Sequence, residues 1–92
     1  MTERRPNRRP ATESEVLKAR YDEARAIKDA WDHRLRRAHI EHAAAQRYGG
    51  DTEAAQRNIT AVQIQVTDAA GELAVALQQW VQSSTHTERR AS

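Results

Sequence analysis

The chain has 92 residues, of which 38% are hydrophobic, 30% are charged and 4% are aromatic, with no Phe and no Cys. These values exclude a large hydrophobic core, a disulfide framework, a thiolate metal site and a cysteine nucleophile. The net charge is +2; residues 1–11 sum to +3 and residues 84–92 to +1, which leaves −2 for residues 12–83. The basic charge therefore lies in the tails, and the charged, Ala-rich composition is typical of long solvated helices.

Residues 1–11 contain Arg-Arg-Pro twice, and we expect a disordered basic arm because proline disfavours a helix. Thr12 and Glu15 have the spacing of a capping box, which predicts a first helix over about 12–48. Its core-facing seam alternates steps of four and three, as in a coiled coil. The seam residues are Leu17, Tyr21, Ala24, Lys28, Trp31, Leu35, Ala38, His42 and Ala45.

A turn is predicted at 49–51, because paired glycines end a helix and Asp51 can cap the next one. The second helix is expected over about 52–83, followed by a polar, basic tail at 84–92. Its seam again alternates steps of four and three. The members are Ala55, Ile59, Val62, Val66, Ala69, Leu73, Ala76 and Trp80.

The two seams agree in register when the chain is folded back at the glycines. Facing positions then sum to about 100, so Trp31 meets the small Ala69 and Tyr21 meets Trp80. The fold class predicted is all-α, a coiled-coil-like antiparallel hairpin of two helices. Because two helices cover only one face of each other, we expect oligomerisation or a partner to complete a helical bundle.

A second apolar stripe lies beside the seam of the second helix, at Ala70, Ala74, Leu77 and Val81. One helix cannot cover both the seam and this stripe. The sequence therefore predicts an interface with a second copy, giving a four-helix bundle, or with a larger protein; the alternative is scattered Ala and Val on a solvated helix. The predicted interface residues are Ala70, Leu73, Ala74, Leu77, Trp80 and Val81.

Candidate catalytic and metal-binding residues are few. His39 and His42 have the spacing of two metal ligands, but no Cys and no His of the second helix completes a set. Lys28 is expected to extend its amine out of the seam rather than serve as a catalytic amine. A two-helix rod offers no concave pocket. We expect no enzyme, no cofactor, no bound metal and no small-molecule substrate.

Arginines gather in both tails, which a hairpin brings to the same end. Six guanidinium groups can bind phosphate or an acidic protein surface, whereas a solvated tail is the simpler interpretation. Binding of nucleic acid through the tails is therefore an alternative function. The arginines concerned are Arg4, Arg5, Arg8, Arg9, Arg89 and Arg90.

The length, the hairpin and the sequence Tyr48-Gly49-Gly50 resemble the WXG100 family, whose members are secreted helical hairpins with an aromatic-x-Gly turn. Tyr48 replaces the family's Trp, and the Tyr-x-x-x-Asp/Glu export signal of the family is absent from the tail. The resemblance implies a secreted hairpin that pairs with a second one, and it remains a minor alternative.

The main functional hypothesis is a non-enzymatic scaffold, adaptor or assembly protein, such as a component of a bacterial or phage particle. The start of the sequence lacks the apolar core of a signal peptide, and no apolar run approaches membrane-spanning length. We therefore expect a cytoplasmic or virion-associated protein with no membrane partner.

Overall fold

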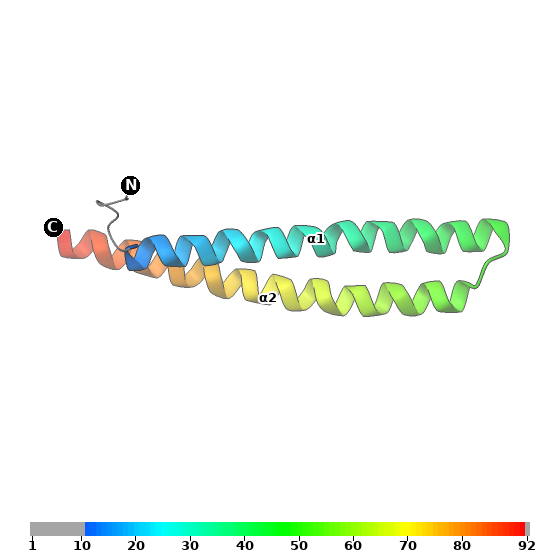
Figure 1. The fold of residues 1–92 in the computed structure, drawn as a ribbon. Helices are drawn as coiled ribbons and strands as arrows, with labels where there is room; N and C mark the ends of the chain where they lie inside the picture. Colours follow the sequence, from blue (N-terminus) through cyan, green and yellow to red (C-terminus); the bar gives the residue numbers. More distant parts are fainter. Residues whose placement is uncertain (1–10, 92) are drawn as a thin grey trace, which may run out of the picture.

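The structure, a computed structural model, describes residues 11–91, and the side chains of residues 11–85 within them. The chain forms two helices, α1 (Glu13–Tyr48) and α2 (Thr52–Ala91), with no strand in the described part. Figure 1 shows the two helices side by side and antiparallel, joined by one short turn. The predicted all-α helical hairpin is confirmed. The arm expected at residues 1–11 lies almost entirely outside the described residues.

The first helix begins where the capping box predicts. The Thr12 backbone N–H donates to Glu15 Oε1 at 2.9 Å, and the Glu15 backbone N–H donates to Thr12 Oγ1 at 3.1 Å. The two side chains thus satisfy two N–H groups that would otherwise lack a helical partner. Glu13 and Glu15 also place negative charge in the first turn, where the helix dipole favours it.

The turn ends α1 at Gly49, which has φ 85° and ψ 25°, in the left-handed region. The backbone N–H groups of Gly49 and Gly50 both donate to the carbonyl oxygen of Ala45, at 2.9 and 2.8 Å. Asp51 then starts α2, because its Oδ1 accepts from the Ala54 N–H at 3.0 Å. Hydrogen bonds therefore account both for the predicted end of α1 and for the predicted start of α2.

Alanine substitutions at Gly49 and Gly71 are expected to change stability in opposite directions. Gly49→Ala forces a Cβ into the left-handed region and should lower the free energy of unfolding by about 1 kcal/mol. Gly71 lies inside α2, and a Cβ built there meets nothing within 4 Å. Gly71→Ala should therefore raise the free energy of unfolding by about 0.5–1 kcal/mol. Urea denaturation followed by circular dichroism measures both, and equal signs would contradict this assignment of the turn.

The seams of both helices face each other. Each of the nine α1 positions and each of the eight α2 positions predicted for the seam is buried or half-buried. The predicted aromatic pair at the open end forms, with the ring centroids of Tyr21 and Trp80 5.5 Å apart. The buried core of the described part is small and made of short side chains. It consists of Ala38, Ile59, Val62, Ala69 and Ala76.

The end of α2 differs from the prediction. The helix continues to Ala91, eight residues beyond the expected end at Ser83, so that most of the predicted tail at 84–92 is helical. No Gly or Pro follows Gly71, and an established helix extends at low cost because each added residue gains one hydrogen bond. Ser and Thr at 83–87 are only mildly unfavourable in a helix, so polar composition alone does not stop it.

Candidate association surface

The six residues predicted as an interface occupy two different environments. Leu73 and Trp80 belong to the seam and are half-buried against α1, so they hold the hairpin together. Leu77 and Val81 keep 40% and 51% of their surface exposed, Ala74 is exposed and Ala70 is half-buried. We call Ala70, Ala74, Leu77 and Val81 the α2 stripe. The stripe is thus an apolar row that the hairpin itself covers only in part.

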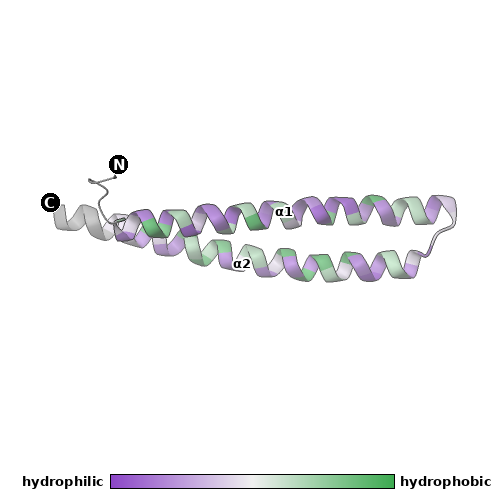
Figure 2. Cartoon of the chain, viewed as in Figure 1, coloured by the Kyte–Doolittle hydropathy of each residue, from purple (hydrophilic) through white to green (hydrophobic). Residues whose placement is uncertain are grey.

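The two helices differ sharply in charge, a signal that seam analysis alone does not find. In α1, 15 of 36 residues are Asp, Glu, Lys or Arg, whereas α2 has seven in 40. No charged residue occurs between Glu72 and Glu88, the segment that contains most of the α2 stripe. Figure 2 shows the same contrast, with hydrophilic residues prevailing along α1 and paler or hydrophobic ones along α2. Depletion of charge marks the cores of protein interfaces.

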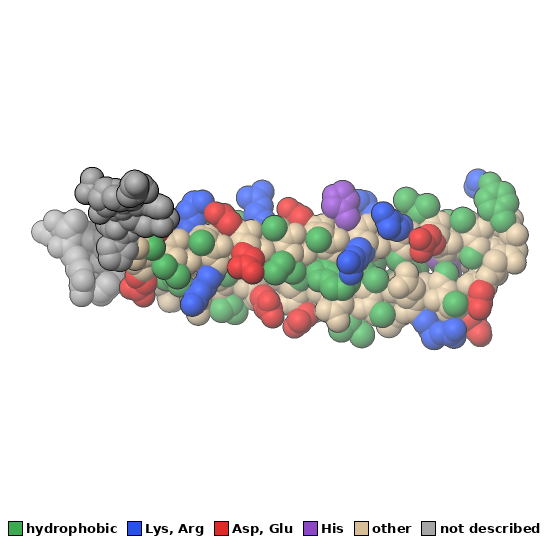
Figure 3. Space-filling model, viewed as in Figure 1, with side chains coloured by type: hydrophobic (Ala, Val, Ile, Leu, Met, Phe, Trp, Pro, Cys, Tyr) green, Lys and Arg blue, Asp and Glu red, His purple; other side chains and the backbone are tan. Residues whose placement is uncertain are grey.

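Other large apolar side chains are exposed, but they are dispersed. Ile40 is on α1, and Ile64 precedes the stripe by six residues on α2, while Ile27 and Val75 are on the other side of the seam. In Figure 3, hydrophobic atoms on the visible face are interspersed with charged side chains along the rod. A shallow hollow surrounds Gly71 on α2, and the sequence had not indicated it. Its lining is Thr67, Asp68, Gly71, Glu72, Val75, Ala76 and Gln79.

Two polar residues, Lys28 and His42, interrupt the α1 seam; the first forms an ion pair and the second is half-buried. The Lys28 amine extends out of the seam to Asp32 Oδ2 at 2.8 Å, one turn along the same helix. Asp32 was not identified from the sequence, although its i,i+4 spacing carries the signal. His42 is half-buried in the seam, and His39 is exposed. Among the described residues, no three His, Cys, Asp or Glu side chains gather as metal ligands.

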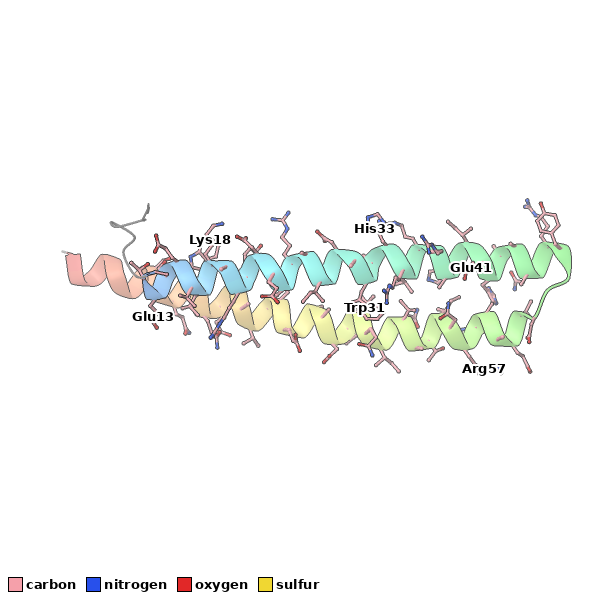
Figure 4. All side chains as sticks on the ribbon, viewed as in Figure 1. Glu13, Lys18, Trp31, His33, Glu41 and Arg57 are labelled. Carbon is pink, nitrogen blue, oxygen red and sulfur yellow. The ribbon has the colours of Figure 1, made fainter. Side chains whose placement is uncertain are left out.

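An arginine cluster on α1 was also missed from the sequence. We give this name to His33, Arg34, Arg36 and Arg37, which with Ile40 line one hollow. Arg36 Nη2 and His33 Nδ1 are 3.0 Å apart, and the Arg34 guanidinium lies 4.6 Å from the centroid of the Trp31 ring. In Figure 4, Trp31 points toward α2 and His33 points away from it. His33 therefore lies on the outer face of α1, whereas Arg34 and Arg37 also line a hollow that α1 shares with Asn58, Val62 and Gln65 of α2.

The six tail arginines predicted to bind phosphate lie outside the part of the chain whose side chains the structure describes. Arg4, Arg5, Arg8 and Arg9 lie outside the described residues, and Arg89 and Arg90 lie in the last turns of α2, where side chains are not described. The arginine cluster is the basic feature that the structure does place.

No helix among the described residues has the length and apolar character needed to cross a membrane. Comparison with protein-family models, curated proteins and solved structures finds no match. The resemblance to WXG100 hairpins thus continues to depend on the sequence at Tyr48-Gly49-Gly50 and on the shared hairpin plan.

Proposed function

We propose that this protein is a non-enzymatic scaffold or assembly protein that acts by packing the α2 stripe against another protein surface. The observation that supports the proposal most directly is the partial exposure of Leu77 and Val81 on a helix segment without charges. A contiguous apolar row that a fold leaves exposed marks a site of association. Surface helices of soluble proteins carry polar and charged residues on the face opposite their apolar stripe, and α1 has 15 charged residues against seven in α2.

The small core supports the same proposal. Five residues of the described part are buried, three of them alanine, and no large side chain is fully buried. Small domains with so little buried apolar area commonly gain stability by oligomerisation or by binding a partner. Packing against the α2 stripe would bury the apolar surface that Leu77 and Val81 leave exposed in the hairpin.

Light scattering over a concentration series is the test, at about 0.1 M and about 1 M salt. The wild-type chain is expected to show a mass above the 10.4 kDa of one chain at both salt levels, because apolar contact is not screened. Leu77→Glu should return the mass to that of one chain, since a charge buried in an apolar contact costs several kcal/mol. The same substitution at the exposed Ile64, Ile64→Glu, is the matched control and should leave the mass unchanged.

A chain lacking residues 1–10 is expected to keep the mass of the full chain, because the α2 stripe lies elsewhere. Association that disappears at high salt or with this deletion would instead indicate binding through the arginine-rich arm. A folded single chain at every concentration would contradict self-association.

A further inference from the structure

We infer that the α2 stripe packs against the same stripe of a second copy of this chain, with the two α2 helices antiparallel. The two-fold axis lies at the level between Val75 and Ala76. The inference rests on the proposed function, to which it adds the identity of the partner and the geometry of the contact.

The spacing of the stripe is the first support. Its four members are separated by four, three and four residues, so the order of spacings is the same in both directions. An antiparallel two-fold therefore sets Ala70 opposite Val81 of the second copy and Ala74 opposite Leu77. Each pair joins a small and a large side chain, as interdigitating layers require. The stripe is thus complementary to itself, which a two-fold contact demands.

A parallel two-fold fits the same residues poorly. It would set Leu77 against Leu77 and Val81 against Val81, while Ala70 and Ala74 would face their own copies across a gap. Crowding in two layers and voids in two others both reduce packing energy. Side-chain size therefore favours the antiparallel arrangement.

Charges on α1 give a second, independent support. The Tyr21–Trp80 contact fixes how α1 lies along α2, so the same axis sets residues 13–15 of one copy level with residues 36–38 of the other. Glu15 then lies level with Arg36 of the second copy's arginine cluster, and Arg37 lies one residue further along the helix. Opposite charges at matching levels favour this alignment of the two rods.

The middle of α1 is also compatible with the axis. Lys18 comes within one residue of the level of Asp32 of the second copy, which adds an opposite charge near the Lys18–Asp22 ion pair. Arg25 lies nearest the axis and meets its own copy there. Asp22 and Asp29 flank it one turn away on either side and supply the compensating charge.

Single cysteines test the geometry, because the chain has no native Cys. In the antiparallel dimer, residue 74 lies about 4.5 Å along the axis from its own copy, and so does residue 77. Ala74→Cys and Leu77→Cys should therefore each form a disulfide-linked dimer under mild oxidation, since a disulfide joins Cα atoms roughly 4.4–6.8 Å apart. Ile64→Cys is the exposed control: in this dimer residue 64 lies about 34 Å along the axis from its own copy, so it should stay uncross-linked.

Cysteines at the two ends of the stripe distinguish the orientation. Residue 70 lies about 16 Å along the axis from its own copy, as does residue 81, so Ala70→Cys or Val81→Cys alone should not cross-link. An equimolar mixture of these two variants should give the mixed disulfide. Circular dichroism on each variant checks that the helices are retained.

Two outcomes overturn the inference. Cross-linking of Ala70→Cys alone as readily as Ala74→Cys would indicate a parallel dimer, and a folded wild-type chain that remains a single chain by light scattering would leave no dimer at all. The first outcome leaves the proposed function standing, since the chain still associates through the stripe. The second contradicts self-association and leaves a different protein as the partner that the proposed function requires.

Discussion

Replacing Ile59 with alanine is expected to lower the free energy of unfolding by about 3 kcal/mol. Ile59 is 3% exposed and is the largest of the buried residues, in a core that otherwise consists of alanines and one valine. The residues around Ile59 belong to two packed helices that cannot move freely, so the cavity left by the substitution cannot close completely. A loss of this size is a large share of the total stability of a small fold.

Ile64→Ala is the matched control, because it removes the same atoms from the same helix. Ile64 is 61% exposed, and its substitution should change the free energy of unfolding by less than about 0.5 kcal/mol. Urea denaturation at one protein concentration, followed by circular dichroism, compares the two. Similar losses at both positions would mean that the seam does not face α1 as described.

The second large effect is expected at the open end of the hairpin, where Trp80→Ala removes the ring that pairs with Tyr21. The Lys18 ammonium also lies 5.8 Å from the centroid of the Trp80 ring, and this contact is lost too. Because Trp80 is half-buried, we expect a loss of about 2 kcal/mol, below the 3–5 kcal/mol typical of a buried ring.

Amide hydrogen exchange can show where along the helices Trp80→Ala lowers the stability. Protection should fall at residues 17–25 and 76–85, near the missing ring, while residues around Ala38 and Ile59 keep theirs. Tyr48→Ala is the control, since Tyr48 is an exposed aromatic at the opposite end. Uniform loss of protection along both helices would show that the hairpin opens as one unit and would contradict a local role for Trp80.

The sequence was sufficient for those features that depend on local chemistry or on periodicity. Gly49 and Asp51 mark the turn because few other residues satisfy its backbone, and the seam follows from apolar residues at steps of four and three. Two seams read separately also predicted the Tyr21–Trp80 pair. In each case the conformational preference of the local residues and the packing of the two helices favour the same structure.

Other features did not follow from the sequence. The end of α2 was misplaced because Ser83 and the residues after it disfavour a helix only weakly, and nothing breaks it. The hollow at Gly71 and the arginine cluster depend on how side chains meet on the outer surface, which periodicity does not specify. The apolar periodicity of α2 identified the exposed α2 stripe, but an exposed apolar face does not by itself specify which protein binds to it.

The single turn also determines the order in which contacts between the helices become accessible during folding. Ala45 and Ala55 are 10 residues apart along the chain, whereas Tyr21 and Trp80 are 59 apart. Closing a short loop loses less chain entropy than closing a long one. The hairpin can therefore zip from Gly49 outward, each layer shortening the loop that the next must close, and a pulling force at the two chain ends would open it in reverse, beginning at Trp80.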